Sequence, residues 1–232
     1  MIRVLPLTFA IFAAAPAFAD ERVFDVSGFS GVSVGAGLTV EIAEGAAFAV
    51  VAEGSERALG RLQIEARGET LVIEQSPRGF ERFSPLMWAL ADEAQVRVSL
   101  PELAAVTASA GSDVRATGSA EEAFSAEASS GAGLSVAGVA AEAVRLSSSS
   151  GARLEVVGSC GALNAEASSG AALDAGGLTC DSASVEASSG ADVEIAAVDV
   201  RAEASSGADI EVWGASKVEA DESSGGDVRV HD

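Results

Sequence analysis

Residues 183–195 read ASVEASSGADVEI, and this stretch decides the fold. Counted from Gly190, the apolar residues Val185, Val193 and Ile195 lie at odd distances, whereas acidic residues lie at even distances on both sides. An apolar residue at every second position is the pattern of a β-strand that buries one face. Glycine adopts backbone conformations that strain residues with a Cβ atom. The stretch therefore predicts two strands joined by a tight Ser-Ser-Gly corner.

The Ser-Ser-Gly motif recurs through the second half of the chain. Its copies end at Gly131, Gly151, Gly170, Gly190, Gly207 and Gly225, and a weaker Ser-Ala-Gly copy ends at Gly111. Successive glycines are 20, 20, 19, 20, 17 and 18 residues apart. The third residue after each glycine is apolar: Val114, Leu134, Leu154, Leu173, Val193, Ile210 and Val228. A helix is disfavoured because the apolar spacing is two and every repeat contains glycine and β-branched residues.

These repeats predict an all-β fold, a single-stranded β-helix (β-solenoid) with coils of 17 to 20 residues. Each repeat forms one coil, and the coils stack at a spacing of about 4.8 Å. A β-propeller is less suitable because its blades need about twice this repeat length. We expect regular coils over residues 106–232. Residues 20–105 are β-rich but less regular, and they are expected to cap the solenoid or to form its first coils.

The composition combines strong acidity with a high apolar content. The chain has 14 Lys+Arg and 35 Asp+Glu, a net charge of −21, yet 48% of its residues are hydrophobic. Disordered acidic chains are poor in apolar residues, so disorder is disfavoured. Binding to nucleic acids or to anionic lipid surfaces is also disfavoured, because both need Lys and Arg. The alternation explains the composition by placing apolar residues inside the coils and acidic residues outside.

The first 19 residues have the pattern of a cleaved signal peptide. Arg3 precedes an apolar stretch over residues 4–15, and Ala17-Phe18-Ala19 has the small-x-small pattern of a cleavage site. The alternative is a buried or membrane-anchoring N-terminal helix. No later run reaches the roughly 20 apolar residues of a transmembrane helix. We expect an exported protein, located in the periplasm or at the cell surface, or released outside the cell.

An insertion over residues 79–94 interrupts the strand signals of the N-terminal part. It gathers three of the few aromatic residues of the chain, Phe80, Phe83 and Trp88, together with Leu86 and Met87. The favoured interpretation is a loop or short helix that covers the solenoid. The alternative is a contact site for a partner or membrane, because aromatic residues dominate the energetics of many interfaces.

The order of motifs resembles that of a known family. Phe29-Ser30-Gly31-Val32, the strands at residues 38–42 and 71–73, the Leu100-Pro101-Glu102-Leu103 link and residues 109–114 are similar to the head GIN domain family of auto-transporter adhesin domains. The resemblance covers nearly the whole chain after the leader. It implies a right-handed β-helix on an exported bacterial protein, and it offers no catalytic residues to transfer. The insertion and the alanine-rich coils depart from the family pattern.

The two cysteines suggest a disulfide between neighbouring coils. Cys160 and Cys180 lie one repeat apart, at similar distances after their corner glycines. Stacked strands bring such positions within reach of a disulfide, and export favours its oxidation. We therefore predict a Cys160–Cys180 disulfide, with two buried thiols as the alternative.

The acidic ladders are candidate calcium ligands. Calcium binds carboxylate oxygens, and repeated carboxylates recur on successive coils. The candidates are Asp192, Asp209, Asp227, Glu166, Glu186 and Glu203. The favoured interpretation is a solvated acidic surface that keeps the coils soluble and blunts edge pairing. No other metal or cofactor is expected.

Catalytic chemistry has little support in the sequence. His231 is the one histidine and lies beside the C-terminus, which disfavours a Ser-His-Asp triad and a zinc site of standard ligands. We expect no catalytic residues and a non-enzymatic, adhesin-like or structural binding module of the bacterial envelope. Its expected ligand is an envelope or extracellular protein or polysaccharide. The alternative is a periplasmic carbohydrate-binding or carbohydrate-active β-helix protein, and a role in envelope signalling also stays open.

Overall fold

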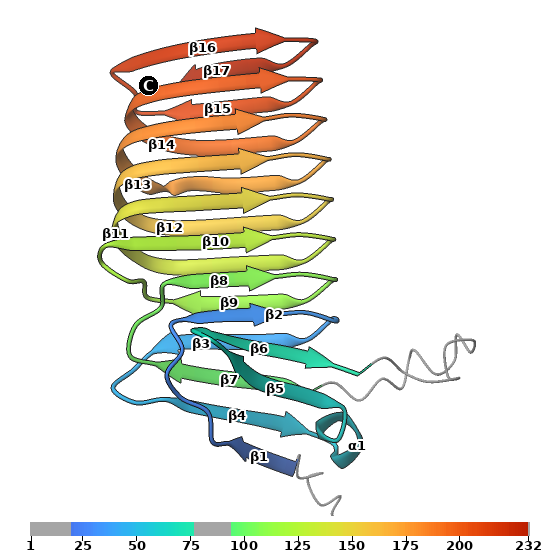
Figure 1. Cartoon of the computed structure of the whole chain (residues 1–232). Coiled ribbons are helices and arrows are strands. Elements are labelled where there is room, and N and C mark those ends of the chain that lie inside the picture. The colour runs from blue at the N-terminus through green and yellow to red at the C-terminus, as the bar shows by residue number, and fades with distance from the viewer. Residues whose placement is uncertain (1–19, 77–93, 232) are drawn as a thin grey trace, which may run out of the picture.

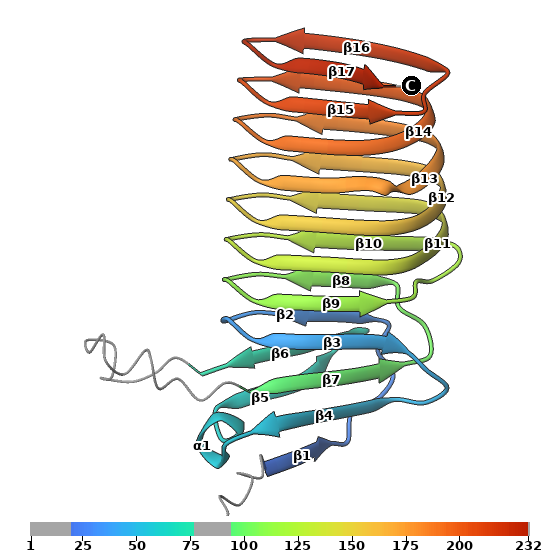
Figure 2. The same ribbon diagram turned by 180° about the vertical axis from the view of Figure 1, so that it is seen from behind.

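The computed structural model describes residues 20–76 and 94–231, which form a long β-solenoid (Figures 1 and 2). The predicted signal peptide (residues 1–19) and the candidate contact residues Phe80, Phe83, Leu86, Met87 and Trp88 lie outside the described residues. The N-terminal elements are β1 (Asp20–Phe24), β2 (Gly31–Val34), β3 (Thr39–Glu44), β4 (Ala49–Gly54), α1 (Glu56–Leu59), β5 (Leu62–Arg67), β6 (Thr70–Gln75) and β7 (Gln95–Leu100). The remaining strands are β8 (Ala105–Ala108), β9 (Asp113–Thr117), β10 (Ala123–Ala128), β11 (Gly133–Ser148), β12 (Arg153–Ala167), β13 (Ala172–Ala187), β14 (Asp192–Ser205), β15 (Asp209–Trp213), β16 (Lys217–Ser223) and β17 (Asp227–His231). The predicted all-β solenoid is confirmed.

Each coil crosses two faces of a flattened column. The front face consists of β8, β10, the C-terminal halves of β11 to β14, and β16, all paired in parallel. The back face consists of β9, the N-terminal halves of β11 to β14, β15 and β17. Residues at equal distances from their corner glycines pair, so Leu134 lies opposite Val114 and Leu154. This register produces the side-chain ladders that the sequence predicts.

The interior is narrow and apolar. The inward residues Leu134, Leu154, Leu173 and Ile210 are nearly inaccessible to solvent. Burial of each such side chain stabilises the fold by about 2 kcal/mol. Small residues, mostly alanines, face inward beside the corners, where the two faces approach each other: Ala108, Ala128, Ser148, Ala167, Ala187 and Ala204.

The Ser-Ser-Gly corners are tight turns with two residues in the left-handed region. At one corner, Ser189 has a φ of 56° and Gly190 has a φ of 69°. The Ala191 N–H donates to the Ser188 carbonyl at 3.3 Å, which closes a four-residue turn. Positive φ at both central residues is the requirement of a type I′ turn. The Gly190 N–H also donates to the Ser206 carbonyl of the next corner at 3.2 Å, so the corners themselves are hydrogen-bonded along the column.

The coil stack begins before the Ser-Ser-Gly repeats. Strands β2 and β3 form a coil around a corner in which Ala36 and Gly37 have φ values of 62° and 71°. This coil pairs in parallel with β8 and β9. On its other side, β6 and β7 pair in parallel with β2 and β3. The N-terminal part therefore contributes coils to the solenoid.

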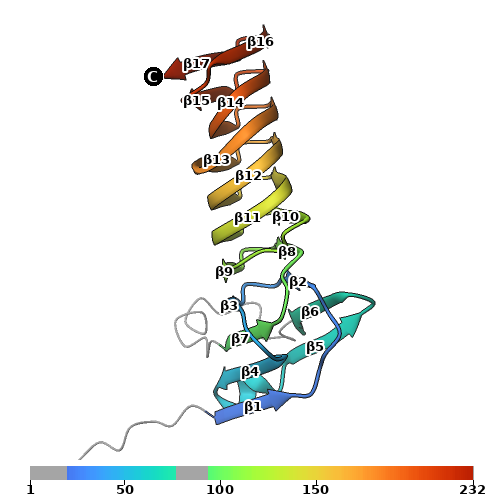
Figure 3. The same ribbon diagram turned by 90° about the vertical axis from the view of Figure 1, so that its left-hand side faces the viewer.

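The N-terminal end of the stack is covered by antiparallel strands. Strand β5 pairs with β6, while β4 pairs with β7 and with β1. Figure 3 shows these strands at one end of the column and β16 and β17 at the other. The end formed by β5, β4 and β1 is a cap on the parallel coils. None of the described helices is long and apolar enough to span a membrane.

The coil formed by β16 and β17 carries a carboxylate at an inward position. Glu222 lies three residues before Gly225, where earlier coils have alanine or serine. The Val228 N–H donates to Oε1 of Glu222 at 2.9 Å. Glu222 is exposed at this end of the stack, and a charge on an edge strand disfavours the addition of further strands.

Candidate functional site

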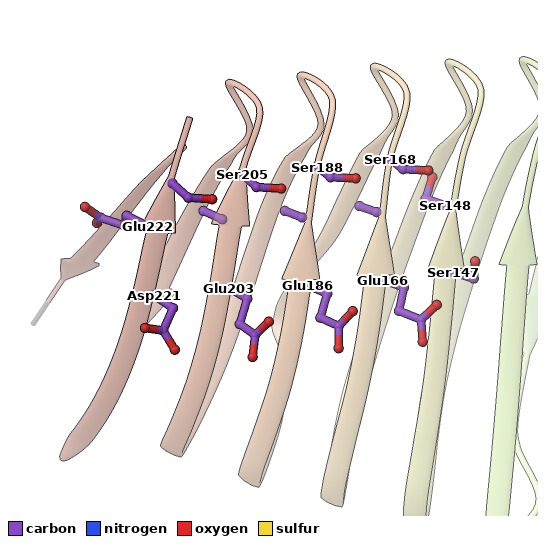
Figure 4. A pocket seen from close by; sticks show the side chains of 14 residues that line it. Ser147, Ser148, Glu166, Ser168, Glu186, Ser188, Glu203, Ser205, Asp221 and Glu222 are labelled. Carbon is purple, nitrogen blue, oxygen red and sulfur yellow. The ribbon is translucent and has the colours of Figure 1, made fainter. Parts of the chain in front are cut away.

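The front face carries a groove lined by acidic and serine side chains, shown in Figure 4. Its volume is about 440 Å³. We call it the acidic groove, and we define it by two ladders: Glu166, Glu186, Glu203 and Asp221, and Ser168, Ser188, Ser205 and Ser223. Because the coils pair in parallel register, each side chain recurs beside its counterpart on the next coil.

The carboxylates of the groove lie side by side and do not converge. In Figure 4 Glu166, Glu186 and Glu203 point the same way from successive strands, whereas Glu222 points away from them. Carboxylates on strands about 4.8 Å apart repel by roughly 1 kcal/mol per pair in water. The groove is therefore a linear array of hydrogen-bond acceptors that favours cationic or hydroxyl-bearing ligands.

One arginine partly neutralises the groove near its C-terminal end. Arg201 lies 3.3 Å from Glu203, 3.5 Å from Glu219 and 3.8 Å from Asp221. Its hydrogen bond to Glu203, together with these negative charges, raises the pKa of Arg201. Within the described residues, Glu166 and Glu186 have no ion pair, so the middle of the groove keeps its full negative charge.

The second set of candidate calcium ligands lies on the back face. Arg229 lies 3.1 Å from Asp209 and 2.5 Å from Asp227. These carboxylates, Asp227 foremost, raise the pKa of Arg229. Asp192 lies one coil further along. Over residues 20–76 and 94–231, no group of three or more His, Cys, Asp or Glu side chains is arranged to hold a metal ion.

The two cysteines join neighbouring coils. Cys160 on β12 lies opposite Cys180 on β13, and their sulfur atoms form a disulfide with a Cα–Cα distance of 4.5 Å. The Cys180 side chain is buried. The bond lies between the two faces at the corner opposite the Ser-Ser-Gly turns, where the register between coils is irregular. The disulfide links the two neighbouring coils covalently, and we call it the staple.

His231 is not part of a catalytic triad among the described residues. Its ring stacks on Trp213 with centroids 4.2 Å apart and an interplanar angle of 19°. Its Nε2 lies 3.8 Å from Oε2 of Glu211 and has no hydrogen-bond partner. The sequence analysis did not single out Trp213. Trp213 lies six residues after Gly207, and this even distance predicts an outward side chain. A large outward aromatic residue is the sequence feature that could have identified it.

Comparison with known sequences places this architecture in a family. The profile described as "Putative auto-transporter adhesin, head GIN domain" matches residues 28–216. The chain belongs to the head GIN domain family. The resemblance seen in the motifs is confirmed, and the family is adhesin-like by its description. None of the curated proteins matches the chain.

Solved structures share the fold of this head GIN domain. A crystal structure described as "a putative adhesin" from Bacteroides fragilis is 12% identical, with a TM-score of 0.79, and the match covers 92% of this chain and 97% of that one. One described as "Putative lipid binding protein" from Parabacteroides distasonis is 11% identical, with a TM-score of 0.68 and coverage of 94% and 98%. A third, "a putative adhesin" from Parabacteroides merdae, is 12% identical, with a TM-score of 0.65 and coverage of 94% and 98%. At these identities the likeness shows the fold alone.

Proposed function

We propose that this head GIN domain is an exported, non-enzymatic binding module of the bacterial envelope that works in an adhesin-like way. The observation that carries the proposal is the acidic groove, in which one arrangement of carboxylate and hydroxyl groups is repeated coil after coil. A repeated array suits binding spread over an extended partner. Catalysis instead needs groups that converge on one reacting atom. The adhesin-like family supports the same conclusion.

Binding would be distributed over the coils. The strands fix the backbone positions of these side chains, so no backbone has to be ordered when a partner docks. A partner with repeated ammonium, amide or hydroxyl groups can engage several coils at once, and linked weak contacts multiply into useful avidity. The ligand class proposed here is an envelope or extracellular protein or polysaccharide. If the protein is retained in the periplasm, the partner is a periplasmic molecule. If it is exposed at the surface, the partner lies outside the cell.

Location is tested by fractionating cells of the native host and treating intact cells with protease. The proposal expects the chain without residues 1–19 in an exported fraction. Digestion on intact cells would favour contact with other cells, and protection would favour a periplasmic partner. A cytoplasmic protein that keeps its leader would refute export.

Binding is tested with a pair of matched double variants. Glu166→Gln with Glu186→Gln removes two charges from the acidic groove, and Glu155→Gln with Asp174→Asn removes two from the back face of the same coils. We expect the first pair to weaken binding of the purified protein to envelope preparations or whole cells, and the second to leave it unchanged. Equal binding by both variants would refute the role of the groove.

A further inference from the structure

Trp213 is an exception among the described aromatic side chains. Phe29 and Phe124 are buried, and Phe24 and Phe48 are partly buried against the core. Trp213 is 37% exposed and faces outward from β15 on the back face. Apart from Val157, that face presents mostly small or charged side chains around Trp213. An exposed indole on such a surface is not needed by the core, which suggests a role in contact with a ligand.

One face of the indole is covered and the other is open. His231 stacks on Trp213 from the neighbouring strand β17, with 4.2 Å between ring centroids. Stacking along the strand-to-strand direction turns the opposite indole face toward β14. The residue opposite Trp213 there is Ala196, whose methyl group is too small to cover an indole. His231 therefore holds the ring upright, and the free ring face lies over Ala196.

The residue of β13 opposite Ala196 is Thr179, a side chain much smaller than an indole. Strand β13 bulges at Gly176 and Gly177, where its register with β14 shifts between Ala175 and Thr179. The next bulky apolar side chain at the matching distance from a corner glycine is Val157 on β12, which is 43% exposed. Three strand spacings, roughly 14 Å, separate Val157 from Trp213. Val157 packs over Gly177, since its Cγ2 atom would lie 3.0 Å from a Cβ atom placed there. We call the strip of the back face between Trp213 and Val157 the trench; its outward residues include Ala196, Thr179 and the two glycines.

Carboxylates line the side of this trench. Glu194 and Glu211 lie opposite each other on β14 and β15, two residues before Ala196 and Trp213 respectively. The Glu194 carboxylate leans over the bulge, because its Oε1 would lie only 2.8 Å from a Cβ atom placed on Gly176. Glu194 has no ion pair within the described residues, and Glu211 meets only His231, at 3.8 Å. Both carboxylates are free to accept hydrogen bonds from a ligand.

We propose that this trench is a saccharide-binding site that holds an uncharged hexopyranose unit of a glycan. The apolar face of the sugar ring would stack on the free face of Trp213, and its edge hydroxyls would donate to Glu194 and Glu211. The proposal rests on the proposed binding function and names a ligand class for it. It places this contact on the back face, separate from the acidic groove.

The combination of groups favours an uncharged sugar over other ligands. Anionic glycans are disfavoured by the two carboxylates and by the net charge of −21. A simple cation needs only carboxylates, which the front face supplies in longer ladders without an aromatic ring. A flat apolar surface beside hydrogen-bond acceptors matches a ligand that is itself apolar on one face and hydroxylated at its edge. A pyranose ring has this character.

The test uses the full mature chain with Trp88→Phe, because the sequence has two tryptophans and this change leaves Trp213 as the reporter. Neutral gluco-oligosaccharides and N-acetylated chito-oligosaccharides are titrated in low salt and in molar sodium chloride. We expect a saturable change in Trp213 fluorescence with an affinity that salt barely alters. Saturation-transfer difference NMR on the same sugars reports binding from the ligand side, without a fluorescence response.

Variants assign the binding to the trench. Trp213→Ala is expected to weaken sugar binding at least about tenfold, because aromatic anchors carry much of the energy of such contacts. Trp213→Phe should restore part of it, and Glu194→Gln should weaken it. Glu127→Gln, on β10 and outside both the acidic groove and the trench, is the control and should leave it unchanged. Thermal midpoints of all variants verify folding.

Three outcomes would overturn the proposal. One is the absence of saturable binding in both measurements, and another is binding that survives Trp213→Ala in the folded protein. The third is binding of a trilysine peptide that molar salt abolishes, without any sugar binding, which would define a cation site. If Trp213→Ala still binds cells while sugars fail, the saccharide site is refuted and the proposed envelope-binding function stands.

Discussion

Replacement of Gly190 by alanine isolates the energetic requirement of the Ser-Ser-Gly corner. A Cβ atom added to Gly190 would meet no heavy atom within 4 Å, so the substitution creates no clash. The φ of 69° is the relevant cost, because an L-residue in the left-handed region is destabilised by about 1–2 kcal/mol. Alanine also restricts the unfolded chain, which offsets about 0.4–1 kcal/mol of that cost. We expect a net loss of about 1 kcal/mol in the free energy of unfolding.

The assay is equilibrium unfolding in urea, followed by circular dichroism, with the midpoint compared at constant slope. Ser189→Gly is the matched control at the neighbouring position. It relieves the left-handed strain of a residue with a φ of 56° but frees the unfolded chain, so its net effect should be close to zero. Gly158→Ala is a comparison in which the added Cβ atom does clash, since it would lie 2.1 Å from the Val139 carbonyl oxygen. It should destabilise more than Gly190→Ala does.

The outcome that would refute this reasoning is specific. If Gly190→Ala unfolds at the wild-type midpoint, the positive φ does not limit the choice of residue at the corner. If Ser189→Gly destabilises as much as Gly190→Ala, the serine side chain matters more than the backbone conformation.

Three further predictions follow from the staple, the acidic ladder and the terminal coil. Replacing Cys160 and Cys180 together by alanine should lower the free energy of unfolding by about 3 kcal/mol on the loop-entropy model, and a reductant should then have no further effect on the variant. Glu186→Gln should raise the free energy of unfolding by a few tenths of a kcal/mol in low salt and not in high salt, because it relieves repulsion between exposed carboxylates. Glu203→Gln is the control: it also removes the ion pair with Arg201, so it should not raise the free energy of unfolding. Glu222→Val should promote concentration-dependent association in light scattering, because it removes an exposed charge from an edge strand; a strictly monomeric variant would contradict that role.

The coil repeat was predictable because successive side chains of a strand point to opposite faces, which leaves a two-residue period in the sequence. Residues at odd distances from each corner glycine lie inside, and those at even distances lie outside, as the burial of Leu154 and the exposure of Glu155 illustrate. The parallel register follows from the same count, since Glu166 and Glu186 stand at equal distances from their glycines. The acidic groove could therefore be listed residue by residue from the sequence. The concave shape of the groove could not be predicted from the sequence, because it depends on how the faces curve.

The sequence left open whether residues 20–105 cap the solenoid or form its first coils, because the corner of the first coil lacks the serines. Ala36 and Gly37 meet the same backbone requirement as Ser189 and Gly190, and Val40 and Ile42 occupy the matching inward positions. The conformation selects small residues, while the serine identity is incidental to it. The stacking order was also hidden, because the coil of β6 and β7 follows β2 and β3 in sequence but pairs on the side away from β8.

A solenoid in perfect register repeats every outward side chain, so a position that departs from its ladder carries more information than the ladder itself. The ladder that contains Trp213 holds the smaller residues Ala137, Val157 and Ala196 at the same distance from the corner. A large ring there adds no buried core surface and leaves apolar area exposed to water. Its retention next to Glu211 and under the ring of His231 is explained if a ligand covers the free face. The repeat supplies the scaffold, and the break in the repeat locates the contact.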